Sequence, residues 1–497
     1  MPALRPASHL GSTLRLSRAA AFWVVGGTVA ALLAASSAPS PLYPIYQQEF
    51  RFSALELTAI FAVYVLAVLL SLLTVGRLSD FTGRRPVLAG ALVVEAAAMA
   101  VFLTAEGTHW LLAARVVQGL ATGAAIGVLG AYLLDLQPAD GRRLGSLVNS
   151  VAPAAGLGIG ALGTGLLVQY GPYPTRLTFA LLAGVFAVLA AVTATLPETV
   201  RPVPGALASL RPRVAVPARA RRPFAAAPPT MLSTWALGGL MFSVGGSVVR
   251  TVFDRPSTAV VGVVLGIFAG AAAATGVLVS PLSPERIERL GTVALAVGAG
   301  VFLVALEVSS LALFVMAGAL AGSGFGSAFL GSMRSLTQLA EPHERAALLS
   351  AVFVASYLAL SVPALAAGVL IPRIGLLDTT VGYAGLVGVG ALASFALPVL
   401  TRPAAAPAAE LADRLGWARQ SGAEAAPDRR LAHESSLKVP PKMSELPNVD
   451  GHWLFGPGRN ASDGASGSSP DSSGSSASSA SRGSAAPPVT SLTNACR

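Results

Sequence analysis

Residues 76–88 read GRLSDFTGRRPVL, a short polar stretch between two long apolar segments. The segment before it, residues 55–75, and the segment after it, residues 87–105, each carry a single charged residue. A helix crosses about 30 Å of hydrocarbon with about 20 mostly apolar residues. The stretch therefore predicts a polar loop that joins two membrane-spanning helices.

The rest of the chain repeats this alternation. Of its 497 residues, 53% are hydrophobic and 12% are charged, whereas soluble domains carry about 25% charged residues. Unbroken apolar runs favour helices over barrel strands, which would alternate over segments of about ten residues. The sequence predicts an all-α membrane protein with twelve transmembrane helices, at residues 19–42, 55–76, 86–105, 110–135, 144–168, 175–196, 230–249, 257–280, 291–307, 310–332, 346–371 and 379–401.

The arginines of the predicted loops set the expected orientation. They are concentrated in the loops on the N-terminal side of the membrane, for example Arg77, Arg201, Arg286 and Arg334. Because cytoplasmic loops carry an excess of basic residues, we expect a multi-pass protein of the cell membrane with both termini in the cytoplasm. The net charge of +10 then faces anionic lipid head groups, and no nucleic-acid partner is needed to explain it.

Two segments interrupt the membrane pattern. Residues 197–229 are rich in Pro and Arg, which disfavours a packed core and predicts a cytoplasmic linker. The last segment is rich in Ala, Pro, Gly and Ser, and this composition predicts a disordered cytoplasmic tail. The expected order is a cytoplasmic N-terminus at 1–18, a six-helix bundle at 19–196, the linker, a second six-helix bundle at 230–401 and the tail at 402–497.

The spacing G-x-L-x-D-x-x-G-R-R in residues 76–85 resembles the motif that major facilitator superfamily transporters carry between their second and third spans. The family usually has a basic residue where this chain has Phe81, which leaves the two following arginines as partners for Asp80. An aspartate accepts charge-assisted hydrogen bonds from arginine and can also face the positive N-terminal end of a helix. In the family that helix is the eleventh span, which should start near Ala346 here. The resemblance implies a conformational latch at Gly76, Asp80, Gly83, Arg84 and Arg85; the alternative is that these arginines only anchor the topology.

The fourth predicted span contains LLAARVVQGLATGAA, residues 111–125, which resembles the family pattern R-x-x-Q-G-x-x-x-G. An arginine inside a span is unfavourable unless it faces a wet cavity or a partner. Because Arg115 lies close to the expected start of its helix, the alternative is that its side chain snorkels to the surface. The resemblance implies a cavity or coupling role for Arg115, Gln118 and Gly119.

Glu95 is the single charged residue of the third predicted span. At about 1.5 Å per residue it lies about 13 Å past Pro86, near the middle of the membrane. Carboxyl groups at this depth are typical of proton relays, so Glu95 is a candidate for proton coupling. A structural pairing with a neighbouring helix is the alternative.

The fifth predicted span contains NSVAPAAGLGIGALGTG, residues 149–165, which resembles the glycine-proline motif of drug/proton antiporters. Two expected glycines are replaced, by Ala152 and Leu157, which weakens the implication of antiport. Small residues let helices approach closely, and we expect this packing role for Pro153, Gly156 and Gly160.

Together these resemblances cover residues 19–401 and imply two six-helix bundles around a central cavity that opens alternately to either side. They imply secondary transport of a small molecule, most directly efflux coupled to protons. Uptake by symport, facilitated diffusion, and a non-transporting membrane sensor or scaffold are the alternatives. Aromatic side chains suited to an apolar or cationic substrate are expected at Tyr64, Trp235, Phe325 and Tyr357.

Other classes of protein find no support in the sequence. The only lysines, Lys438 and Lys442, do not stand in the G-x-x-x-x-G-K-[ST] motif of an ATP-driven motor. The five histidines are scattered and the one cysteine, Cys496, lies near the C-terminus. We therefore expect neither an enzyme nor a metal or cofactor site, and we expect a monomer in the lipid bilayer.

Overall fold

The computed structural model describes most of the apolar part of the chain. The predicted tail at 402–497 and most of the predicted N-terminal segment lie outside the described residues. The described residues are 15–138, 144–212, 214–221, 224, 228–338, 341 and 344–400.

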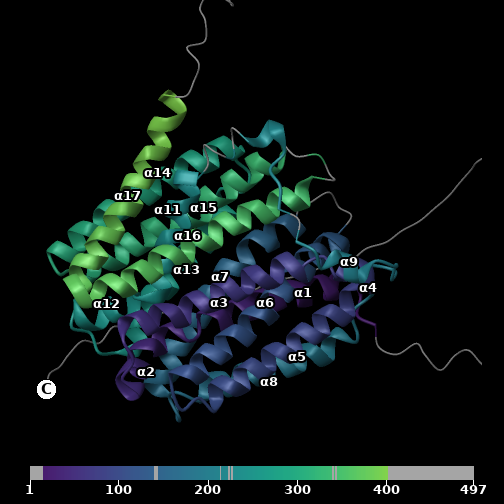
Figure 1. Ribbon diagram of the computed structural model, residues 1–497, viewed down its shortest axis with the longest axis horizontal. Helices are drawn as coiled ribbons and strands as arrows, with labels where there is room; N and C mark the ends of the chain where they lie inside the picture. The colour runs from purple at the N-terminus through teal and green to yellow at the C-terminus, as the bar shows by residue number, and fades with distance from the viewer. Residues whose placement is uncertain are drawn as a thin grey trace, which may run out of the picture. The chain divides into compact units, whose positions relative to one another are not determined.

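The first bundle is formed by helices that follow one another from Arg18 to Thr193 (Figure 1). Its second span begins with a capping box, in which Ser53 Oγ accepts from Glu56 N and the Glu56 carboxylate accepts from Ser53 N. The helices are α1 (Arg18–Ser37), α2 (Tyr43–Phe50), α3 (Ala54–Thr74), α4 (Ser79–Thr82), α5 (Arg84–Leu103), α6 (Thr108–Leu136), α7 (Leu144–Tyr170) and α8 (Leu177–Thr193).

The second bundle has a bent first span, because α11 and α12 meet at an angle of 53°. Its last two spans turn sharply at Gly375, whose φ of 89° favours glycine. The helices are α11 (Pro228–Ser243), α12 (Gly245–Thr251), α13 (Thr258–Leu278), α14 (Pro284–Glu307), α15 (Leu311–Gln338), α16 (Arg345–Ile374) and α17 (Leu376–Leu400).

The predicted spans agree with the helices of the structure. Among the described residues, ten helices are long and apolar enough to cross a membrane, and the bent α11–α12 pair makes an eleventh. The remaining predicted span is α8, an apolar helix of 17 residues, which pairs with α5 through the stacked rings of Phe102 and Phe179 at 4.6 Å. The structure is therefore the all-α, two-bundle membrane fold that the sequence predicts.

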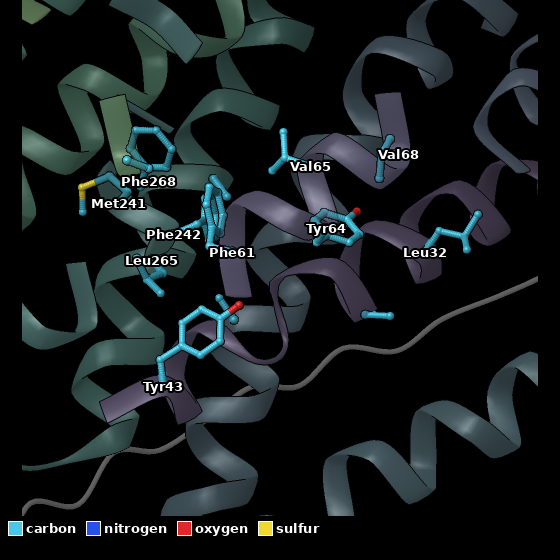
Figure 2. Packing of buried hydrophobic residues seen from close by; sticks show 14 of the residues in the cluster. Leu32, Tyr43, Phe61, Tyr64, Val65, Val68, Met241, Phe242, Leu265 and Phe268 are labelled. Carbon is cyan, nitrogen blue, oxygen red and sulfur yellow. The ribbon is translucent and has the colours of Figure 1, made fainter. Parts of the chain in front are cut away.

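Two helix pairs make the most extensive contacts between the bundles. Along α7 and α13, glycines replace side chains where the backbones meet, and Gly165 lies directly against Gly262. Along α3 and α16, Gly368 lies against Thr58. Most of the buried hydrophobic residues form one cluster across both bundles, including Phe61 of α3 and Phe268 of α13 (Figure 2).

The linker packs more closely than its composition predicts. Val203 N donates to Phe81 O of the motif loop at 2.9 Å, and the linker contains the short helices α9 (Ala206–Ser209) and η2 (Ala218–Ala220). Ala220 is fully buried in a cluster with Leu348 of α16. The predicted tether thus makes specific contacts, through the Val203 backbone with the motif loop and through the Ala220 side chain with α16, while the Val203 and Leu207 side chains stay exposed.

Candidate functional site

The loop that carries the predicted latch forms a charge cluster at one end of the first bundle, which we call the motif end. Gly83, at the start of α5, has a φ of 98°, which favours glycine. Arg84 Nη1 donates to Asp80 Oδ1 at 2.5 Å, and its Nε donates to Asp135 Oδ2, near the end of α6, at 3.3 Å. The aspartate and first arginine of the motif thus pair with each other, and the cluster extends to a second acidic residue.

The sequence did not predict a role for Glu198, which completes this cluster. Its carboxylate accepts hydrogen bonds from the backbone N–H groups of Arg84 at 2.8 Å and Arg85 at 3.0 Å. These are the first two residues of α5, where amides lack partners within the helix and negative charge is favoured by the helix dipole. The signal that could have indicated Glu198 is an acidic residue on the same membrane face as the start of another helix.

The other motif residues also contact the first bundle. The Gly76 backbone lies so close to α6 that a Cβ on Gly127 would come within 2.9 Å of Gly76 Cα. Arg85 Nε donates to Thr193 O at 3.3 Å, and Arg85 Nη2 donates to Ala194 O. In the described part of the chain, the motif residues therefore connect the start of α5 with the ends of α6 and α8 within one bundle.

Among the described residues, no hydrogen bond or ion pair joins Asp80 to the eleventh span, α16. The Asp80 carboxylate is held by Arg84, and 48% of the Asp80 side chain is exposed. The start of α16 instead meets the linker, where Ala215 N donates to Ala347 O at 3.4 Å. A latch between the bundles therefore stays a prediction. Arg84 has specific hydrogen-bond partners, which an arginine that only anchored the topology would not need.

Arg115 lies at the centre of a second polar site, inside the first bundle. Its side chain is completely buried. Its Nε and Nη2 donate to Tyr43 Oη at 3.0 and 2.5 Å, and its Nη1 donates to Ser36 O at 3.0 Å and to Gln118 Oε1 at 2.8 Å. The alternative of a snorkelling arginine is therefore wrong, because every described partner lies within the protein.

The same site contains Glu95, whose side chain is also completely buried. Gln118 Nε2 donates to Glu95 Oε1 at 3.3 Å, and Thr122 Oγ1 donates to Glu95 Oε2 at 3.1 Å. Gln118 therefore bridges the carboxylate and the guanidinium of Arg115. We call the following residues the buried polar network: Ser36, Tyr43, Tyr64, Glu95, Arg115, Gln118 and Thr122.

Tyr64 contacts this network on the side of α3. Its ring centroid lies 4.8 Å from Arg115 Cζ, a distance at which a cation is attracted to an aromatic face. Its hydroxyl lies 2.5 Å from Ser36 Oγ. Figure 2 shows Tyr64 together with Tyr43 among the buried side chains. The structure thus places Tyr64 beside the charged groups, although the sequence predicts a substrate-lining role for it.

The other predicted aromatic residues come together in the second bundle. The Trp235 ring of α11 lies 5.4 Å from the Tyr357 ring of α16 and 5.9 Å from the Phe325 ring of α15. Phe329, which the sequence did not single out, lies 5.1 Å from Trp235 in an edge-on arrangement. Trp235 Nε1 is buried and has no hydrogen-bond partner among the described residues, so this aromatic cluster contains a donor that a ligand could satisfy.

The predicted small residues lie at helix contacts. A Cβ on Gly119 would come within 2.6 Å of Ala67 Cβ on α3, so this glycine serves packing and does not line a cavity. Gly156 and Gly160 lie against the α1 backbone, at Ala30 and Ala34 respectively. Pro153 lies inside α7, the same helix. The glycines let α7 pack closely on α1 and α6 pack closely on α3, and these two partner helices contribute Ser36 and Tyr64 to the buried polar network.

Comparison with known proteins agrees with this architecture. The family model described as Major Facilitator Superfamily matches residues 24–362, which cover nearly all of the first bundle, most of the second and both polar sites. The chain belongs to this superfamily. Within it, "Citrate exporter 1" of Aspergillus niger is 33% identical over 132 residues, 26% of this chain and 25% of the exporter. The match thus spans about a quarter of the relative's length.

Solved structures of the Major Facilitator Superfamily share the fold at low sequence identity. The nucleoside transporter NupG is 13% identical with a TM-score of 0.58, and the match covers 76% of this chain and 99% of that chain. The human organic anion transporter MFSD10 (TETRAN) is 18% identical with a TM-score of 0.55, covering 76% of this chain and 100% of that chain. These likenesses establish the fold alone.

Proposed function

We propose that this protein is a proton-coupled secondary transporter that exports a small molecule by alternating access. The observation that carries the proposal is the buried polar network, in which Glu95 is enclosed within the first bundle and linked through Gln118 to Arg115. Burying an ionisable group inside a membrane is energetically unfavourable, and such groups mark pathways for ions, protons or substrates. The proposal assigns transport, and not catalysis, to the chain.

The hydrogen bonds of Glu95 indicate how a proton would act. Both carboxylate oxygens accept hydrogen bonds, one from Gln118 and one from Thr122. A protonated carboxyl has an O–H donor in place of part of its acceptor capacity, so a bound proton changes which hydrogen bonds Glu95 can make with Gln118 and Thr122. Gln118 Oε1 also accepts from Arg115. Protonation of Glu95 therefore affects Arg115 through the side-chain amide of Gln118. Hydrogen bonds in such a network strengthen one another at low dielectric constant, so a change in one affects the others.

The network also connects to elements that have to move. Arg115 binds Tyr43, which begins α2, and Ser36 near the end of α1. Helix α2 lies against α12 of the second bundle, with Pro44 beside Gly246. A change at Glu95 can therefore alter the contact between the bundles, which is the coupling that alternating access requires.

The direction and the substrate are assigned on other grounds. The relative from Aspergillus niger is named an exporter, and the fifth span resembles the motif of drug/proton antiporters, so we assign efflux. The aromatic cluster at Trp235, Phe325 and Tyr357 supports a substrate with an apolar or planar part. We assign the protein to the cell membrane as a monomer, with cytoplasmic termini and the domain boundaries expected above.

The test is transport in proteoliposomes, using a panel of dyes and carboxylates with and without an imposed proton gradient. We expect Glu95→Gln to abolish the response to the gradient, because an amide cannot take up the proton. The matched control is Glu307→Gln, which removes an exposed carboxylate at the end of α14. A gradient response that persists in Glu95→Gln would refute proton coupling through this residue. Transport unaffected by collapse of the gradient would indicate facilitated diffusion, and no transport of any compound would favour the sensor or scaffold.

A further inference from the structure

A cavity of about 360 Å³ lies at the end of the bundles opposite the motif end, between α2 and α12. Its size falls at the lower end of the range for small-molecule sites. It is separate from the buried polar network and from the aromatic cluster, because it shares no residue with either. The residues that line it are Pro44, Gln47, Gln48, Ser247, Arg250, Thr251 and Pro256.

The chemistry of the lining selects for an anion. Arg250 is its one charged residue, and the described lining contains no carboxylate. Arg250 Nη1 donates to Pro256 O at 3.1 Å, which fixes the guanidinium at the wall of the cavity. The acidic residues closest in the chain, Glu49 and Asp254, are exposed and do not belong to the lining. A planar guanidinium binds carboxylates with two parallel hydrogen bonds, and a single cation matches one carboxylate group.

The remaining polar groups suit a ligand with hydroxyl groups. Gln47, Gln48 and Thr251 each offer both donors and acceptors to the cavity. Ser247 Oγ is buried and has no hydrogen-bond partner in the described part of the chain. A buried hydroxyl without a partner is unfavourable, so a ligand hydroxyl that binds Ser247 would remove this penalty.

The cavity is formed by both bundles, with α2 on one side and α12 on the other. The bundles are held together nearby, where Gln169 Oε1 accepts from Ser257 Oγ and Thr258 N, both at 3.1 Å. A ligand that contacts both sides binds only while this end is closed. Such a ligand must shift the population towards the closed form.

We propose that this cavity is a binding site for a small hydroxylated carboxylate, which bridges α2 and α12 and stabilises the conformation that is closed at this end. The proposal goes beyond the proposed function and does not depend on proton coupling. Ligand binding in this cavity would regulate the conformational change, and the cavity is separate from any substrate site inside the bundles.

The test uses the full-length protein in lipid nanodiscs and malate, a hydroxy-dicarboxylate, as the probe. Binding is measured by calorimetry, in parallel with the uncharged diamide of malate. We expect Arg250→Gln to weaken malate binding by roughly tenfold to a hundredfold, since a charge-assisted contact is lost. Ser247→Ala is a smaller change that should weaken binding severalfold without disturbing the fold. The matched control is Arg255→Gln, an exposed arginine outside the lining.

A second measurement reports the conformation. After Cys496→Ser removes the one native cysteine, spin labels at positions 49 and 254 record the separation of α2 and the loop after α12. Malate should increase the short-distance population, and Arg250→Gln should abolish this response. Repeating the binding experiment in Glu95→Gln protein separates this site from proton coupling, since Arg250→Gln should weaken malate binding in that background as well. Equal malate affinity in Arg250→Gln and Arg255→Gln, or malate binding without any shift in distance, would overturn the proposal.

Discussion

Replacing Arg115 with alanine should destabilise the protein far more than replacing an arginine at the surface. The Arg115 side chain donates to Tyr43 Oη, Ser36 O and Gln118 Oε1, and no part of it is exposed. Its removal leaves three polar groups inside the bundle without this donor. Each such group costs about 1 to 3 kcal/mol. We therefore expect the free energy of unfolding to fall by about 3 kcal/mol or more.

The assay is unfolding by SDS in mixed micelles, followed by circular dichroism at helical wavelengths. Arg373→Ala is the matched control, because Arg373 is exposed near the end of α16 and surface changes usually stay within about 0.5 kcal/mol. Arg115→Lys keeps the charge and loses the planar fork, so it should unfold with an intermediate loss and still transport poorly. An Arg115→Ala protein as stable as Arg373→Ala would refute the reasoning.

Three further predictions concern other parts of the molecule. Glu198→Ala should lower the free energy of unfolding by about 1 kcal/mol in the same assay, because α5 loses the cap on its first two amides; an unchanged value would contradict this role. Gln169→Leu removes the hydrogen bonds to Ser257 and Thr258, so distances between spin labels at positions 49 and 254 should lengthen, and identical distributions would count against a closing role. Leu207→Cys, at a linker position that is 84% exposed, should react with an impermeant maleimide only after cells are permeabilised; labelling from outside would reverse the proposed topology.

The charge cluster at the motif end was partly predictable from the sequence. Asp80 and Arg84 stand four residues apart, and their pairing depends on the local turn at Gly83 between α4 and α5, a glycine that the motif itself contains. Glu198 lies 114 residues from Arg84 along the chain, and nothing near it in the sequence indicates which helix it caps. The position of the cap depends on α8 ending beside the start of α5, which is decided by helix packing.

The buried polar network was likewise only partly predictable from the sequence. One helix carries Arg115 and Gln118 three residues apart, so the sequence places both on one face. Whether that face meets lipid, water or protein is not a property of the helix alone, and a position near the helix start is compatible with a snorkelling side chain. Tyr43 lies 72 residues away from Arg115, and Glu95 lies 23 residues from Gln118. Only the packing of α2, α5 and α6 brings these groups together.

By itself, the sequence determined the membrane class, the positions of the spans and the family, since crossing a bilayer requires about 20 apolar residues in a row and this is a local property. The tertiary structure decided which polar groups are buried together and where a cavity lies between α2 and α12. The physical reason is that unpaired polar groups are unfavourable in an apolar interior, so their positions follow from contacts between helices that are distant in the chain.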